Sequence, residues 1–310
     1  MADDHEGQRV SRRTALAGIG SIGLGALLAA CGDDAGTPTA VTTTSGSTAT
    51  ITPQSTATSG LEDLFAGANT CTLTETTTQG PYYFDADKVR SDIREDREGT
   101  PLRVAVKVQD SETCKPLSGA VVEIWHCDAG GIYSGAEALS SGQGGPGGGG
   151  PGGGTPPSGG PGMGTPPSGG PGGPGGGTPP SGGPGGGGGD MGDLEPADDK
   201  RYLRGAQVTG ADGIVQFVTI WPGWYRGRTV HIHAMVHVGD ARVLTTQMMF
   251  DEDLNTTVFE GRPYARHTGR DTFNDGDNIY EPSMLMKVTR QGGGYVGAIV
   301  FAADSDQDKT

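Results

Sequence analysis

Residues 221–237 read WPGWYRGRTVHIHAMVH, a stretch of 17 residues that holds one tyrosine, two arginines and three histidines. His231 and His233 stand two residues apart in an apolar run, and residues two apart in a β-strand point to the same face of a sheet. Tyr225 precedes them by a few residues. Two imidazoles on one face, with a phenol just upstream, indicate half of a metal site. The other ligands must come from elsewhere in the chain.

Short alternating segments continue on both sides of this stretch. Residues 102–108 read LRVAVKV and alternate with period two, as a half-buried strand should. Turn-forming residues at 211–213 (ADG) and 291–294 (QGGG) favour hairpin connections. Eight such strands without a convincing long helix predict an all-β fold, an antiparallel β-sandwich or barrel. The expected strands are residues 102–108, 120–126, 206–209, 214–220, 230–238, 243–250, 284–288 and 295–301.

The first part of the chain, residues 1–30, has the features of an export signal. Ser11-Arg12-Arg13-Thr14 is a twin-arginine start, and the weakly apolar run that follows is too short to span a bilayer as a stable helix. The run ends at Leu28-Ala29-Ala30-Cys31, which resembles a bacterial lipobox. We therefore expect export by the twin-arginine route and a lipid anchor on Cys31, at the outer face of the bacterial cell membrane. The alternative to a lipid anchor is that Cys31 is an unmodified small residue that happens to lie near a cleavage site.

Two low-complexity segments surround and interrupt the predicted domain. Residues 31–68 are rich in Thr and Ser and hold too little apolar surface to offset the entropy of ordering, which predicts a disordered tether. Within residues 141–190, Gly and Pro make up 40 of the 50 residues, which predicts a disordered insertion. The rest of residues 69–310 is expected to form one β-sandwich with a sizeable core.

The charge of the chain limits its partners. The sequence has 22 Lys and Arg against 37 Asp and Glu, a net charge of −15. It therefore lacks the basic surplus needed to neutralise phosphates, and no nucleic-acid partner is expected. Contact with the membrane is expected only through the lipid anchor.

Three cysteines follow the predicted lipobox, namely Cys71, Cys114 and Cys127. Disulfides persist outside the cell, and three thiols allow one bridge and one spare. A bridge between Cys71 and Cys114 is favoured because Cys127 falls at the end of a predicted core strand. The alternative is three unpaired, buried thiols.

Four ordered blocks precede the paired histidines. They are Gly80-Pro81-Tyr82-Tyr83, residues 119–128 (GAVVEIWHCD) continuing to Tyr133-Ser134, Leu203-Arg204-Gly205, and Pro222-Gly223-Trp224-Tyr225. In this order, and followed by His231-Ile232-His233, they resemble the intradiol ring-cleavage dioxygenases, especially an exported, lipoprotein-like branch. The resemblance covers residues 71–301 apart from the insertion.

The resemblance implies a metal and its ligands. Tyr133, Tyr225, His231 and His233 match the residues that ligate a non-haem Fe(III). This set makes physical sense, because two anionic phenolate oxygens are hard donors that favour ferric over ferrous iron.

The reaction that the resemblance implies is cleavage of a small aromatic diol of the catechol type with O2, giving a muconate-type diacid. Arg228 matches the family's active-site arginine, whose guanidinium stabilises negative charge on the substrate and on oxygen. Gln247 matches a position that helps to steer the intermediate. Tyr225 matches the ligand that the substrate displaces and that can take up a substrate proton.

Two other interpretations are kept open. One is a non-catalytic, exported β-sandwich that serves as a binding module, and the other is a zinc or copper site built from His231 and His233. The remaining histidines in the predicted domain, His126, His237 and His267, are expected to be structural or surface groups. Neither the identity of the diol nor the oligomeric state follows from the sequence.

Overall fold

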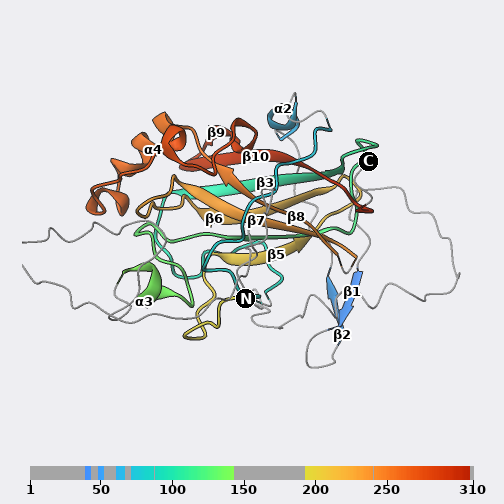
Figure 1. The fold of residues 1–310 in the computed structure, drawn as a ribbon, viewed down its shortest axis with the longest axis horizontal. Coiled ribbons are helices and arrows are strands. Elements are labelled where there is room, and N and C mark those ends of the chain that lie inside the picture. The colour runs from blue at the N-terminus through green and yellow to red at the C-terminus, as the bar shows by residue number, and fades with distance from the viewer. Residues whose placement is uncertain are drawn as a thin grey trace, which may run out of the picture.

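Two four-stranded sheets packed face to face form the centre of the molecule (Figure 1). The computed structural model describes residues 39–42, 48–51, 61–66, 71–86, 88–142, 193–239 and 241–307. The strands are β3 (Pro101–Asp110), β4 (Val121–Trp125), β5 (Arg204–Val208), β6 (Ile214–Ile220), β7 (His231–Val238), β8 (Ala241–Met249), β9 (Lys287–Gln291) and β10 (Gly294–Ala303). One sheet has the order β6-β3-β10-β9 and the other the order β5-β4-β7-β8. The predicted all-β sandwich is confirmed.

Two details of the strands differ from the prediction. Strand β10 pairs with β3 in parallel, from Tyr295 opposite Leu102 onward, whereas the other strand pairs of the two sheets are antiparallel. Strand β9 begins at Lys287 rather than at residue 284, because Pro282–Met284 form a 3-10 turn. Proline has no amide hydrogen to donate and its fixed φ suits such a turn, so the apolar residues there do not extend the strand.

The main core lies between the two sheets. Alternate residues of β3, including Val104 and Val106, and of β7, including Ile232, Ala234 and Val236, are fully buried there. This is the period-two pattern expected of strands that have one face on a core.

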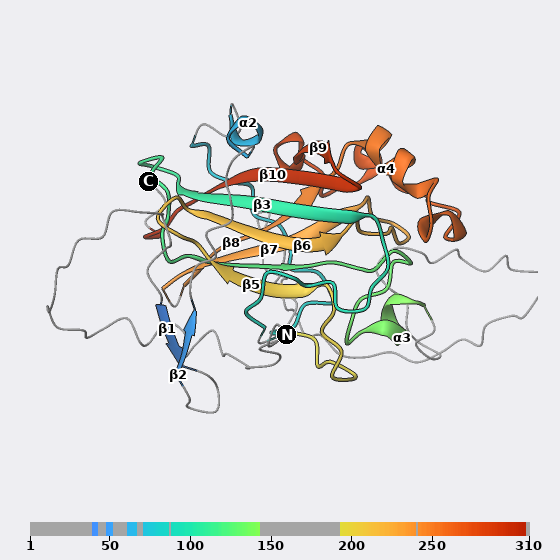
Figure 2. The same ribbon diagram turned by 180° about the vertical axis from the view of Figure 1, so that it is seen from behind.

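Short helices cover parts of the sandwich. They are α2 (Glu62–Phe65), α3 (Glu137–Ser140) and α4 (Glu252–Phe259), with 3-10 turns at Tyr264–Arg266, Asn274–Gly276 and Pro282–Met284. The view from behind shows α2 beyond β10 and β5 on the opposite side of the sandwich (Figure 2). Asp251 caps α4 by accepting hydrogen bonds from the amides of Asp253 and Leu254. No helix among the described residues has the length and apolar character needed to cross a membrane.

Part of the predicted tether has structure of its own. Residues Thr39–Thr42 (β1) and Thr48–Ile51 (β2) pair as antiparallel strands. Leu61 is buried against Ala105, Val296 and Ala298, so the segment that includes α2 packs on the outer face of the sheet β6-β3-β10-β9. The predicted signal with Cys31, the remaining tether and residues 143–192 of the insertion lie outside the described residues.

A disulfide joins Cys71 to Cys114, with a Cα–Cα distance of 5.2 Å, which is the pairing favoured from the sequence. Cys127 is a free, buried thiol. Residues 71–84, here called the N-terminal strap, run from this disulfide along the sandwich. The amide of Thr74 donates to the carbonyl of Ala302 in β10, and that of Thr77 donates to the carbonyl of Thr245 in β8. The strap thereby reaches the sheet that carries the paired histidines.

Candidate metal centre

Strand β7 sends its side chains alternately to the two faces of its sheet. Ile232, Ala234 and Val236 point into the core between the sheets. His231 and His233 therefore point to the opposite, outer face. This outer face is covered by the strap and by the loop after β4, so that each histidine is only 2% exposed. The alternation expected from the sequence thus places both imidazoles in a second, smaller buried cluster.

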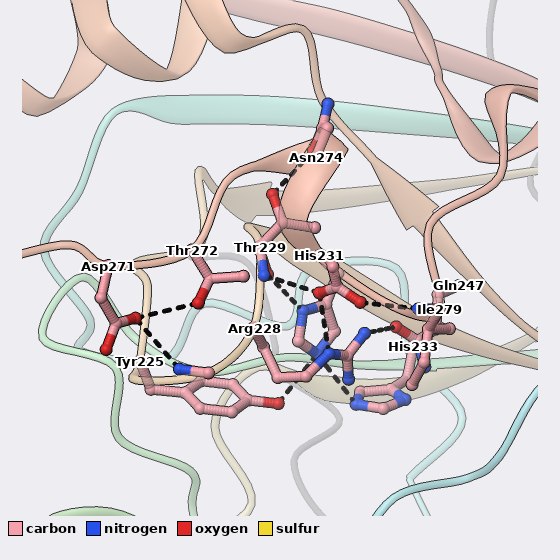
Figure 3. Close-up of polar contacts among 12 residues, drawn as sticks. Tyr225, Arg228, Thr229, His231, His233, Gln247, Asp271, Thr272, Asn274 and Ile279 are labelled. Atoms are coloured by element: carbon pink, nitrogen blue, oxygen red, sulfur yellow. Dashed lines mark hydrogen bonds and ion pairs between the residues drawn. The ribbon is translucent and has the colours of Figure 1, made fainter. Parts of the chain in front are cut away.

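Two phenols reach these histidines from loops. Tyr133 is fully buried in the loop after β4, and Tyr225 is half-buried in the connection between β6 and β7. The Tyr225 hydroxyl lies 3.1 Å from Nε2 of His231, and the Tyr133 hydroxyl lies 3.5 Å from the same atom. Nε2 of His233 lies 3.2 Å from it (Figure 3). The structure therefore brings together all four of the ligands expected from the sequence.

The loop that carries Tyr133 is shaped by local contacts. The carboxylate of Asp128 accepts hydrogen bonds from the amides of Gly130 (2.9 Å) and Ile132 (3.0 Å). Gly131 has φ +84°, and a Cβ atom at this position would lie 2.3 Å from the carbonyl oxygen of Trp224. Only glycine permits this close approach without displacing the backbone. The contact places the Tyr133 loop directly against the connection that carries Tyr225.

The two imidazole rings are oriented so that Nε2 of each is at the centre of the cluster. Nδ1 of His231 lies 2.6 Å from the carbonyl oxygen of Thr229 and donates to it, which leaves a lone pair on Nε2. The His233 ring stacks on Trp125 with a centroid distance of 4.9 Å and an interplanar angle of 4°. Trp125 lies directly opposite His233 in the neighbouring strand β4.

Burial controls the protonation of the cluster. The pKa of His231 is lowered to about 3, first by burial and then by the charge of Arg228. Burial and the neighbouring His231 lower the pKa of His233 well below its ordinary value. Burial raises the pKa of Tyr133 and that of Tyr225. At neutral pH the imidazoles can therefore donate lone pairs, while the phenols keep their protons until a cation replaces them.

The chemistry of the donors narrows the choice of metal. Within the part of the chain that the structure describes, no group of three or more His, Cys, Asp or Glu residues could hold a metal ion. The two imidazole nitrogens are instead accompanied by two phenol oxygens, which become hard, anionic donors when they lose their protons. Such a set suits a ferric ion better than a ferrous ion, whose typical set contains a carboxylate. The residues present therefore fit a non-haem Fe(III).

Arg228 and Gln247 lie together beside the four donors. Gln247 stands opposite His233 in β8, and its Oε1 accepts a hydrogen bond of 2.6 Å from Nη2 of Arg228 (Figure 3). Nε of Arg228 donates to Oδ2 of Asp277 at 2.9 Å, and the same carboxylate oxygen accepts the amide of Thr229 at 2.7 Å. The side chain of Asp277 is fully buried. The guanidinium is therefore held at two points by groups from different segments.

No pattern in the sequence singles out Asp277. It lies 49 residues after Arg228, just beyond the 3-10 turn Asn274–Gly276, where no periodic pattern marks a buried residue. The sequence gives no sign of the role of Thr229 either, although its carbonyl orients His231 and its hydroxyl lies 2.6 Å from Oδ1 of Asn274. Both residues act through backbone or side-chain contacts that depend on the folded loops.

Two of the histidines expected to be structural make structural contacts. His126 is fully buried, with Nδ1 2.7 Å from the carbonyl oxygen of Cys127 and Nε2 2.7 Å from the hydroxyl of Thr219. Burial lowers the pKa of His126 to about 4. His267 stacks on the Trp224 ring at a centroid distance of 3.9 Å.

Two solved structures of similar fold are dioxygenases. An intradiol ring-cleavage dioxygenase from Tetranychus urticae matches with a TM-score of 0.57 and 27% identity, over 76% of this chain and 96% of its own. This likeness supports an enzyme of the same kind. A second structure, described as a dioxygenase, matches with a TM-score of 0.57 and 28% identity, over 76% of this chain and 95% of its own. Comparisons of the sequence with models of protein families and with curated proteins find no match.

Proposed function

We propose that this chain is a non-haem Fe(III)-dependent intradiol dioxygenase, which cleaves the ring of a catechol-type aromatic diol with O2 to give a muconate-type diacid. The observation that carries the proposal is the position of three donor atoms, from Tyr133, Tyr225 and His233, within 3.5 Å of Nε2 of His231. The likeness to an intradiol ring-cleavage dioxygenase supports it.

The four side chains would hold the ion, and the bound ferric ion would supply the Lewis-acid and electron-transfer chemistry that lets a diol react with O2. The two tyrosines differ in their access to solvent. Tyr133 is fully buried, whereas Tyr225 is half-buried. Tyr225 is therefore the phenol that an incoming diol can reach, and its oxygen, as the phenolate that would bind the metal, is placed to take up a substrate proton.

Arg228 and Gln247 supply the polar groups that would contact the substrate and its reacting oxygen atoms. The guanidinium of Arg228 is a fixed positive group beside the donors, so it can stabilise negative charge that develops on the ring oxygens and on the product carboxylate. Nε2 of Gln247 is buried and has no hydrogen-bond partner among the described residues, so it can donate to an oxygen atom of the reacting group. Asp277 holds the guanidinium in place through Nε.

The test of the proposal begins with colour. Tyrosinate bound to Fe(III) has a visible charge-transfer band, so the purified protein should be red-brown, and Tyr225→Phe and His231→Ala should bleach it. Oxygen uptake should then be measured with catechol, protocatechuate and hydroxyquinol, and the products identified. A colourless, iron-free wild-type protein, or one that prefers zinc or copper, contradicts the proposal. Binding of diols by an iron-loaded sample without oxygen uptake favours the binding module.

We further propose that the protein acts outside the cytoplasm, exported by the twin-arginine route and lipid-anchored through Cys31 to the outer face of the bacterial cell membrane. The support is the Ser11-Arg12-Arg13-Thr14 start and the lipobox-like Leu28-Ala29-Ala30-Cys31. Replacing both arginines by lysine should keep the protein in the cytoplasm, and Cys31→Ala should abolish labelling by a fatty acid. Labelling that persists in Cys31→Ala would exclude this anchor.

A further inference from the structure

Arg204 is a buried cation next to the candidate iron site, and the proposed chemistry does not use it. It is 1% exposed and occupies the first position of β5. In the sheet, Arg204 lies opposite Trp125, which in turn lies opposite His233. Residues directly opposite in neighbouring strands point to the same face. Arg204 therefore belongs to the outer face that carries the metal donors.

The hydrogen bonds of Arg204 go to two separate segments. Nε donates to the hydroxyl of Ser134 at 2.9 Å, and Nη2 donates to the carbonyl oxygen of Ser134 at 3.0 Å. Nη2 also donates to the carbonyl oxygen of Tyr82 in the strap at 2.8 Å. Ser134 directly follows Tyr133, and the Tyr82 ring lies 4.8 Å from the Tyr133 ring. One guanidinium thus joins the two segments that flank the Tyr133 phenol.

The path of the chain explains why Tyr133 depends on such a contact. After Tyr133 the described chain continues to residue 142 and resumes at residue 193, and Arg204 lies beyond this point. Arg204 therefore holds the Tyr133 loop from the far side of the insertion. Further bonds join the same two stretches, because the amide of Ala197 donates to the carbonyl of Gly135 at 2.8 Å and the hydroxyl of Tyr202 donates to Glu137 at 2.8 Å.

The geometry of the contact requires arginine in particular. A guanidinium is a planar fork that can meet acceptors on two segments at once, whereas an ammonium is a point charge on a flexible stem. The Arg204 guanidinium also lies 3.9 Å from the centre of the Phe84 ring, which fixes the plane of the fork. The acceptors are uncharged oxygens, so the arrangement serves to hold two segments rather than to pair opposite charges.

We propose that Arg204 is the positioning residue of the candidate iron site: by joining Ser134 to Tyr82, it holds the Tyr133 phenol at the place from which it shares a metal with His231. The effect on iron rests on the proposed function. The joining of the two segments is a property of the metal-free protein and can be tested without iron.

The experiment compares Arg204→Met and Arg204→Lys with a matched control, Arg201→Met. The Arg201 guanidinium lies 4.7 Å from the centre of the same Phe84 ring, but its hydrogen bonds go to the carbonyls of Asp198 and Lys200 in its own segment. Amide hydrogen exchange of the metal-free proteins is measured first. In both Arg204 variants, exchange in residues 82–84 and 133–142 should be about tenfold faster than in wild type and in Arg201→Met, because the contacts that limit local opening are lost.

The second measurement is the release of Fe(III) to a chelator, together with the position of the charge-transfer band. Both Arg204 variants should release iron about tenfold faster than wild type and shift the band, because the Tyr133 oxygen is no longer held in place. Arg201→Met should behave as wild type. If Arg204→Met does not fold, amide exchange and iron release of Arg204→Lys alone test the proposal.

The other possible outcomes either overturn the proposal or contradict the proposed function instead. Unchanged exchange in residues 82–84 and 133–142 of both Arg204 variants overturns the proposal, as does an equal increase in Arg201→Met. Full recovery of exchange and of iron retention in Arg204→Lys overturns it in favour of a simple charge effect. A wild-type protein that binds no iron contradicts the proposed function, while the exchange result still decides whether Arg204 joins the two segments.

Discussion

Both faces of the sheet β5-β4-β7-β8 are buried, but one carries apolar side chains and the other carries titratable ones. On the inner face of β7, Ile232, Ala234 and Val236 have 0% exposure and belong to the core between the sheets. On the outer face of the same strand, His231 and His233 are 2% exposed and lie against phenols. Burial alone therefore does not distinguish a packed core from a reactive site.

The energetic consequences of burial are opposite on the two faces. On the inner face, removal of apolar surface from water stabilises the fold. On the outer face, burial of imidazoles, phenols and guanidinium groups costs free energy, which hydrogen bonds offset and which the proposed metal ion would offset further. Substitutions on the inner face should therefore lower stability and spare the metal, whereas those on the outer face should affect the metal and the reaction more than the fold.

The largest effect is expected for His233→Ala on the outer face. The variant should bind no Fe(III), lack the charge-transfer band and show no measurable oxygen uptake, because it loses one of four donors. Circular dichroism and urea unfolding of the metal-free protein should stay close to wild type. Iron content per chain, measured with the unfolding curve, checks the prediction. An unfolded variant would mean that the outer face is part of the structural core.

Arg228→Met should lower turnover by about a hundredfold to a thousandfold while iron content and colour are kept, since in the proposed function the side chain stabilises developing charge rather than the metal. Steady-state oxygen uptake with the best diol, together with iron analysis, measures both quantities. Loss of iron from this variant would show that Arg228 supports the ligands instead.

Ile232→Ala tests the inner face at the position between the two histidines. Removal of a buried isoleucine side chain should lower the free energy of unfolding by about 3 kcal/mol, from lost burial and the cavity left behind. Iron per folded chain should not change. Urea unfolding and iron analysis provide the comparison, and a bleached but stable variant would contradict the separation of the two faces.

His126 should make stability depend on pH in a defined window. Its pKa is about 4 in the folded protein and about 6.5 when unfolded, so the unfolded state binds more protons between these values. The contribution is fully present above pH 6.5 and is lost as the pH falls to 4, a change of about 3 kcal/mol. Urea unfolding of the metal-free protein at several pH values measures it. His126→Gln should flatten this part of the profile, and an unchanged profile would exclude the assignment.

Asp277→Asn should have the smallest effect, a decrease in turnover of about tenfold with little change in KM, because the carboxylate that accepts the hydrogen bond from Arg228 is replaced by an uncharged amide oxygen. The double variant with Arg228→Met should be no worse than Arg228→Met alone if Asp277 acts through the arginine. Additive losses in this double-mutant cycle would give Asp277 a separate role.

Much of the fold follows from local pattern. The eight strands were predicted close to their observed positions because alternation of apolar and polar residues directly reflects which side chains face a core. The parallel pairing of β10 with β3 was not predicted, since alternation is the same for parallel and antiparallel neighbours. The start of β9 was placed early because apolar residues in a 3-10 turn resemble those of a strand.

By itself, the sequence determined the all-β class, the shared face of His231 and His233, and, through resemblance to a known family, the two tyrosines expected to join them. The first two features follow from the period-two spacing of apolar residues, and the two tyrosines follow from the short sequence blocks that resemble the family. Only the tertiary structure decided which face of β7 holds the site, that Asp277 holds Arg228, and that Arg204 joins Ser134 to Tyr82. These contacts connect residues that are far apart in the chain, and the loops that carry them have no periodicity from which a partner could be inferred.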